Sequence, residues 1–309
     1  MSSFAQETLC LFGQNVVFEE ASFLINTLTG CSFNAKQVER VCHLYGGILE
    51  KELGETIESG VSKVYPEQDN QALHYAMIDG AMYPTKSKEE PWKEVKLGRI
   101  FKEKDILSFS ENKNFITKST YVAHLGEAKD FFPKFEYELE SLKNLVFIND
   151  GGAWIWKWIE STFPNSIQIL DYYHAKEHLC EFAKEYHQDL EHRKKWIDNQ
   201  CDTLLNKTPE EVIANIKELP FQKRTQEIRE RLINYYTTHS KRMRYKCFRE
   251  KGLLIGSGPI ESAHRIFQQR FKLSGQHWTK EGLQKTIQLK SAYESDLWGK
   301  VTDIAKKAA

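Results

Sequence analysis

Apolar residues recur every three to four positions over the first 65 residues, which is the spacing of one face of an α-helix. The segment FEEASFLINTL places Ala21, Leu24, Ile25 and Leu28 on one face, and AKQVERVCHLYGGILEKEL repeats the pattern after the turn TGCSFN. Two helices around a short turn fit a DNA-reading helix-turn-helix, and they also fit a plain helical hairpin. The second helix is not notably basic, which favours the plain hairpin for the helical region 1–65.

From residue 70 the pattern changes to that of β-strands. ALHYAMIDG is a short apolar run, WKEVKLGRIF alternates, and FITKSTYVAHL is rich in β-branched and aromatic residues. A helical stretch at about 127–142 is followed by the strand NLVFIND, the helix AWIWKWIESTF and the strand SIQILD. Three strands, helix, strand, helix, strand is the order of a ribonuclease-H-like core, an antiparallel meander extended by parallel strands. We therefore expect an α/β fold with a mixed sheet.

The rest of the chain divides around this core. Residues 174–250 are helical, charged and too long for a loop, which indicates a helical insertion before the last core helix. GSGPIESAHRIFQQRFKLSG then begins a new helix, with Pro259 suited to its first position. The predicted parts are an N-terminal helical region over 1–65 that is a candidate for DNA binding, a first part of the core over 66–175, a helical insertion over 176–252, and a core completion with the last helices over 253–309.

Composition narrows the class of protein. Lys+Arg and Asp+Glu are both 43, so any affinity for nucleic acid depends on where the charges lie rather than on net charge. The N-terminus lacks the pattern of a signal peptide, and no run approaches the roughly 20 apolar residues that span a bilayer. The six cysteines form no C-x-x-C pair and are typical of reduced thiols. We therefore expect a soluble cytoplasmic protein with no membrane partner.

Two aspartates stand at strand ends and each precedes a glycine. Asp79 closes ALHYAMIDG and Asp150 closes NLVFIND. A single Asp-Gly is most often only turn chemistry, but two on strands expected to be neighbours favour a shared site. Neighbouring carboxylates repel each other unless a cation lies between them, and Mg²⁺ prefers oxygen ligands. The pair therefore predicts a magnesium site.

The helix at 259–272 could complete this site. Glu261, His264, Arg265 and Lys272 fall on one polar stripe, beside an apolar face that would dock on the sheet. Taken alone, the stripe is most simply explained as a charged helix face exposed to solvent. The surrounding charge favours an anion-binding track, because 239–272 holds nine Lys or Arg and two acids. Tyr245, Phe248 and Arg270 also lie in this segment, where the aromatic residues could stack on bases.

Four segments resemble a known family of enzymes. They are DGAMYPTK, WKEVKLG, DGGAWIWKWIESTFPNSIQILDYYHAKEHL and GLLIGSGPIESAHRIFQQRFKLSGQHW. Together they are similar to the DDE transposases of bacterial insertion sequences, in particular the ISKra-type group, over roughly residues 15–300. The resemblance implies a ribonuclease-H-like catalytic core with Asp79, Asp150 and Glu261 as the metal-binding triad. It also implies further sequence before the first residue of this chain.

The resemblance carries cofactors, partners and supporting residues with it. It implies two Mg²⁺ ions, with Mn²⁺ as a substitute, double-stranded DNA as transposon ends and target, and a homodimer or higher assembly on DNA. A bacterial, nucleoid-associated location follows from that activity. We expect Arg265, Arg270 and Lys272 to hold phosphates. Residues that support the metal ligands or contact DNA are expected to be His174, Asp171 and His264.

Two alternatives remain open. One is a DNA-binding protein that derives from a transposase and no longer cuts DNA. The presence of Asp79, Asp150 and Glu261 in this sequence argues against it, because a protein without cleavage activity need not keep all three acids. The other is a zinc metallopeptidase, since His174, Glu177 and His178 match H-x-x-E-H, with Glu261 as a third ligand. The peptidase interpretation leaves Asp79 and the basic 239–272 segment unexplained.

Overall fold

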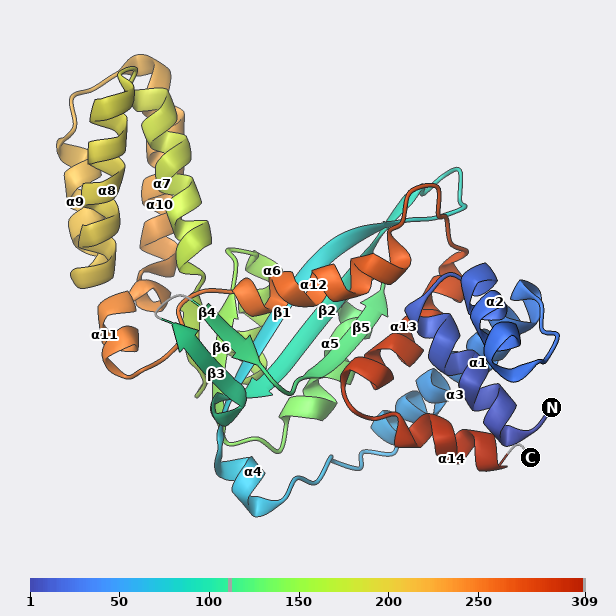
Figure 1. Ribbon diagram of the computed structural model, residues 1–309. Helices are drawn as coiled ribbons and strands as arrows, with labels where there is room; N and C mark the ends of the chain where they lie inside the picture. Colours follow the sequence, from blue (N-terminus) through green and yellow to red (C-terminus); the bar gives the residue numbers. More distant parts are fainter. Residues whose placement is uncertain (111–112, 308–309) are drawn as a thin grey trace. The chain divides into compact units, whose positions relative to one another are not determined.

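The computed structural model describes residues 1–110 and 113–307, and Figure 1 traces them. The chain divides into two compact units, one made of 1–145 with 259–309 and one made of 146–258. The helices of the first unit are α1 Ser3–Asn15, α2 Phe18–Thr29, α3 Ala35–Glu58, α4 Glu67–Gln71, α5 Ala128–Leu139, α12 Gly258–Phe271, α13 Lys280–Glu294 and α14 Gly299–Lys307. Its strands are β1 Leu73–Pro84, β2 Trp92–Lys102, β3 Ile106–Ser110, β4 Lys113–Ile116 and β5 Thr120–Leu125.

The strand β6 Asn144–Asn149 crosses the boundary between the units. The second unit continues with α6 Ala153–Thr162, β7 Ile167–Leu170, α7 Tyr172–Tyr186, α8 Leu190–Asn206, α9 Pro209–Glu218, α10 Gln226–His239 and α11 Tyr245–Glu250. No helix in the described part of the chain is both long and apolar enough to cross a membrane.

The N-terminal helices begin and end where local chemistry allows. Gly30, with φ of 69°, ends α2, because a left-handed backbone costs glycine little. Asn34 begins α3 by accepting from the backbone N–H of Gln37, whose side chain bonds back to the Asn34 N–H. Leu28 and Leu44, which the apolar pattern placed with the buried positions, are exposed. That detail of the prediction was wrong, because the covered arc of each helix is narrower than its apolar stripe.

The helices at the two ends of the chain share one core. Buried side chains of α1, α2 and α3 pack with those of α13 and α14, as the helices on the right of Figure 1 indicate. The crossing of α3 and α13 is close, since a Cβ added at Gly46 would lie 1.9 Å from the Lys285 carbonyl oxygen. The predicted helical hairpin therefore uses its inner face for packing.

The sheet confirms the predicted α/β class. Its strand order is β5-β2-β1-β6-β7. The pairs β1–β2 and β2–β5 are antiparallel and β6–β7 is parallel, so the sheet is mixed and compatible with a ribonuclease-H-like core. The third predicted strand is divided, because residues 113–116 pair with β3 in a separate two-stranded sheet while 120–125 pair with β2.

Two helices cover opposite faces of the antiparallel part of this sheet. Successive strand residues point to opposite faces. Gly98 faces α5, because a Cβ there would lie 2.3 Å from the Phe135 ring. Arg99 faces α12 and donates to the Pro259 carbonyl oxygen at 2.6 Å and the Ser262 hydroxyl at 2.8 Å. Figure 1 shows α12 lying across β1, β2 and β5.

The second unit joins a parallel strand pair to a helical bundle. Its helices α7, α8, α9 and α10 pack each against the next, and α10 returns to α7 (Figure 1). Buried tyrosine hydroxyls join α10 to α7 and α11 to the end of β7. Tyr236 donates to the Ala175 carbonyl oxygen at 2.8 Å, and Tyr245 donates to the Leu170 carbonyl oxygen at 3.0 Å.

Candidate metal and DNA-binding site

Asp79 lies in β1 with its side chain 41% exposed. The prediction that it closes its strand was wrong, because the pairing of β1 with β2 continues to Pro84. Its Oδ1 accepts from the Gly80 backbone N–H at 2.7 Å, and its Oδ2 lies 3.2 Å from His264 Nε2. The strand before it, including Met77 and Ile78, is buried and holds the backbone in place. The Asp79 carboxylate is therefore carried by a rigid backbone and is open to solvent, as a metal ligand needs to be.

Glu261 lies in α12, one helical turn before His264. Residues three apart share a helix face, so Glu261 and His264 lie on the side of α12 that reaches β1 through the Asp79 contact. Glu261 is exposed, while Ile260 and Phe267 of the same helix are buried. The predicted apolar face of this helix is confirmed.

Arg99 holds α12 in this position, although the sequence analysis did not single it out. It is buried, and besides α12 it bonds to the Ser119 hydroxyl at 2.9 Å. Burial lowers the pKa of its guanidinium from the ordinary value. A lone arginine in the apolar run VKLGRIF was the available signal, because a buried cation needs dedicated partners.

His264 is almost fully buried beside Asp79. Direct contact with DNA requires exposure, so burial favours the other predicted role, support of a metal ligand. His264 Nε2 approaches Asp79 Oδ2 to 3.2 Å, without the alignment of a hydrogen bond. His264 can therefore restrict the Asp79 carboxylate without occupying its exposed side.

Asp150 belongs to the second unit and follows β6 directly. Its Oδ1 accepts from the Gly152 N–H at 2.9 Å, and its carbonyl oxygen accepts from Trp156 Nε1 at 2.7 Å. Gly151 must remain a glycine, because a Cβ would lie 2.6 Å from the Tyr235 hydroxyl. The Asp-Gly-Gly turn is thus built to hold Asp150, and its spacing to Asp79 and Glu261 remains a prediction.

Asp171 is a buried connection within the second unit. Its two oxygens accept from the N–H groups of Tyr173, His174 and Ser257 and from the Ser257 hydroxyl, over 3.0–3.3 Å. These bonds cap α7 and attach the segment 255–257 to the end of β7. Because all of them are internal, the geometry supports a structural role rather than contact with DNA.

The H-x-x-E-H segment lies in the first half of α7. His174 and His178 stand in edge contact with ring centroids 5.0 Å apart, and their Nδ1 atoms face Glu177 at 3.4 Å and Glu181 at 3.6 Å. Within the residues that the structure describes, no three His, Cys, Asp or Glu side chains form a group able to hold a metal ion. Asp79 and Glu261 nevertheless offer accessible carboxylate oxygens, the donor type that Mg²⁺ prefers.

The predicted phosphate-binding cations separate into two kinds. Arg265 and Lys272 are exposed, as phosphate binding requires. Arg270 is only 1% exposed, and it donates from Nε and Nη2 to the Gly13 carbonyl oxygen at 3.0 and 2.9 Å. The prediction of a phosphate contact was wrong for Arg270, because Gly13 near the end of α1 and the rings of Phe18 and Trp278 surround its guanidinium.

Other members of the predicted anion track are also engaged. Tyr245 and Phe248 are buried, so the prediction that they stack on bases was wrong. Arg242 pairs with Glu160, and Arg244 pairs with Glu210 at 2.7 Å. The nine cations of the segment are divided between the two units.

Comparison with known proteins adds a family relationship. The family model described as "Uncharacterised protein family (UPF0236)" matches residues 108–307. A protein of Streptococcus gallolyticus named "UPF0236 protein in vanSb 3'region" is 23% identical over 309 residues, covering 94% of this chain. The chain spans 63% of the length of that relative.

Proposed function

We propose that this protein, which belongs to the UPF0236 family, is a DDE-type DNA transposase that cleaves and joins strands at insertion-sequence ends with divalent metal ions. The observation that carries the proposal is the contact between α12 and β1. His264 lies one turn from Glu261, and its Nε2 lies 3.2 Å from Asp79 Oδ2, which supports a shared site for these two acids although they stand far apart in the sequence. The mixed sheet and the resemblance in sequence support the same activity.

In the proposed mechanism the protein supplies position and charge. Asp79, Asp150 and Glu261 would hold two Mg²⁺ ions, which when bound would activate a water or a DNA 3′-hydroxyl for in-line attack on phosphorus. His264 restricts the Asp79 carboxylate, and Arg99 fixes the start of α12, so the acids need little reorganisation during the reaction. Exposed cations such as Arg265 would neutralise the phosphates of the bound strand.

The proposal is tested by strand cleavage. The substrate is duplex DNA made from the sequences that flank the gene, chosen by a search for inverted repeats, with Mg²⁺ or Mn²⁺ in the buffer. We expect Asp79→Asn and Glu261→Gln each to lower nicking and joining by about 1,000-fold or more, because a metal ligand is lost. DNA affinity should change by less than about fivefold, because binding depends mainly on the cations.

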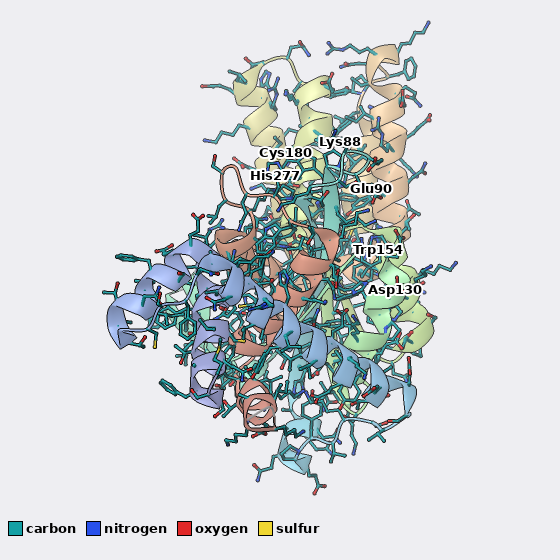
Figure 2. The ribbon with its side chains drawn as sticks, turned by 90° about the vertical axis from the view of Figure 1, so that its right-hand side faces the viewer. Lys88, Glu90, Asp130, Trp154, Cys180 and His277 are labelled. Atoms are coloured by element: carbon teal, nitrogen blue, oxygen red, sulfur yellow. The ribbon has the colours of Figure 1, made fainter. Side chains whose placement is uncertain are left out.

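A matched control is Asp130→Asn, which removes an exposed carboxylate from α5. Figure 2 labels Asp130 among the side chains of the first unit. This variant should cleave at the rate of the wild type. Nicking that persists in Asp79→Asn would remove Asp79 from the site. A wild-type protein that binds the ends tightly but cuts neither strand with either metal would instead establish the silent DNA-binding derivative.

A further inference from the structure

The far end of the β1–β2 hairpin is held against the segment that joins α12 to α13. We call residues 84–93 and 272–280 together the hairpin tip. The Lys86 N–H donates to the Trp278 carbonyl oxygen at 2.7 Å, and the Trp278 N–H donates to the Pro84 carbonyl oxygen at 3.2 Å. Figure 2 labels Lys88, Glu90 and His277, which belong to these two segments. Backbone hydrogen bonds therefore make the hairpin tip a defined surface.

The hairpin tip exposes one large aromatic ring. Trp92 is 49% exposed, whereas Trp278, on the neighbouring segment, is buried. The ammonium of Lys272 lies 5.5 Å from the centroid of the Trp92 ring, within the range of a cation–π contact. An indole held partly in water beside a cation has an apolar face and a charge available to the same ligand.

The charged residues of the hairpin tip that do not pair with each other are mostly lysines. Glu90 faces the ammonium groups of both Lys93, at 3.3 Å, and Lys280, so this acid is neutralised within the tip. Lys86 and Lys88 are both exposed. Together with Lys272, whose ammonium faces the Trp92 ring, they give the hairpin tip three exposed lysines.

The remaining acid of the hairpin tip is Glu89. Its carboxylate accepts from the Ser87 hydroxyl at 2.9 Å, and hydrogen bonds with its own backbone and with Ser87 lower its pKa. It therefore stays anionic and offsets one of the three exposed lysines. A net positive surface remains, which favours an anionic ligand with an aromatic group.

We propose that the hairpin tip binds an unpaired nucleotide at a DNA end, with its base stacked on Trp92 and its flanking phosphates held by Lys272, Lys86 and Lys88. The inference rests on the proposed function, because the proposed transposase activity is the reason to expect DNA as the ligand. Unpaired bases are required because a base inside a duplex has no free face. Stacking on an aromatic side chain with backbone contacts to lysine is a general mode of single-strand binding.

The register of the hairpin predicts where this nucleotide lies. Trp92 is opposite Pro84, and Asp79 lies five residues earlier in β1. A strand rises about 3.3 Å per residue, so roughly 16 Å of strand separates the Trp92 level from Asp79. At the duplex rise of about 3.4 Å per nucleotide this corresponds to roughly five nucleotides, and an extended unpaired strand covers the same length with fewer. The stacked base therefore lies within roughly five nucleotides of the phosphate that Asp79 would serve.

The test measures binding of the full chain to two labelled DNAs, a blunt duplex and the same duplex with an unpaired tail of about ten nucleotides. We expect Trp92→Ala to weaken binding to the tailed DNA by about 5- to 150-fold, the range for losing one stacked base. Binding to the blunt duplex should stay within about twofold. Trp92→Phe should restore most of the affinity, and Lys272→Gln should weaken tail binding and reduce its salt dependence.

Phe109 gives a matched control, since it is an exposed aromatic residue on the separate β3–β4 hairpin. Phe109→Ala should bind both DNAs like the wild type. In a series of tailed DNAs, a single abasic nucleotide replaces each tail position in turn. The difference in affinity between the wild type and Trp92→Ala should disappear when the abasic nucleotide occupies the stacked position, and at that position only. Equal binding of tailed DNA by wild type and Trp92→Ala would overturn the inference alone. A wild type that binds neither DNA would overturn both the inference and the proposed function.

Discussion

Replacement of Arg270 distinguishes a core residue from a DNA contact. Its guanidinium bonds twice to the Gly13 carbonyl oxygen and lies 4.9 Å from the ring centroids of both Phe18 and Trp278. Burial lowers the pKa of Arg270 to about 10, which still leaves it charged at neutral pH. Arg270→Ala removes these contacts and leaves a cavity beside an unpaired carbonyl group.

The expected loss follows from these contacts. A hydrogen bond from a charged donor contributes about 1.5–3 kcal/mol, and buried cation–π contacts add about 1–2 kcal/mol. We therefore expect the free energy of unfolding of Arg270→Ala to fall by about 3–5 kcal/mol. That is a large part of the 5–15 kcal/mol typical of a folded protein. Urea denaturation followed by circular dichroism measures this loss.

Arg265→Ala is the control, because Arg265 is an exposed arginine on the same helix. Its unfolding free energy should change by less than about 0.5 kcal/mol. Its DNA affinity should fall, with a salt slope smaller by about 1. Arg270→Met, which keeps much of the volume, should retain the wild-type salt slope. An Arg270→Ala protein that unfolds like the wild type but loses DNA affinity and salt slope would refute the reasoning.

Two further changes test the packing and the pH response. Gly46→Ala should destabilise the chain by about 1–3 kcal/mol, because the added Cβ would lie 1.9 Å from the Lys285 carbonyl oxygen. Gly54→Ala should stabilise α3 by about 0.5–1 kcal/mol, because its Cβ would have no neighbour within 4 Å. Equal melting temperatures of the two variants would contradict the close helix crossing. Burial, and then the charge of Arg242, lower the pKa of His239 to about 4, so the unfolded chain takes up a proton first as pH falls from about 6.5. Stability should therefore decrease between pH 6.5 and 4, by up to about 3 kcal/mol from this group, and urea titrations should find a shallower decrease in His239→Gln.

Local chemistry predicted most of the elements because their signals lie within a few residues. Alternation predicted β2, and the apolar face of the 259–272 segment predicted α12 with Pro259 near its start. The divided third strand was missed, because FITKSTYVAHL is equally suited to one strand or two. Its partners decide the outcome, since β4 pairs with β3 and β5 pairs with β2.

The candidate site shows the same division. Asp79 and Glu261 could be selected from the sequence, because an Asp-Gly after an apolar run and an acid in a polar helical stripe are local patterns. The position of Asp79 within a longer strand could not, since the pairing of β1 with β2 decides where the strand ends. The contact between His264 and Asp79 could not, since it depends on how α12 crosses the sheet. The anchoring of that helix by Arg99 also joins residues about 160 positions apart.

By itself the sequence determined the order of helices and strands, the neutral overall charge and the candidate acids, because propensity and periodicity are properties of neighbouring residues. Only the tertiary structure decided which positions on each face are covered. Arg265 and Arg270 are the same residue type on one helix, yet one is exposed and the other is buried against Gly13, which is 257 positions away. Burial depends on the segment that packs over a side chain, and that segment can come from the opposite end of the chain.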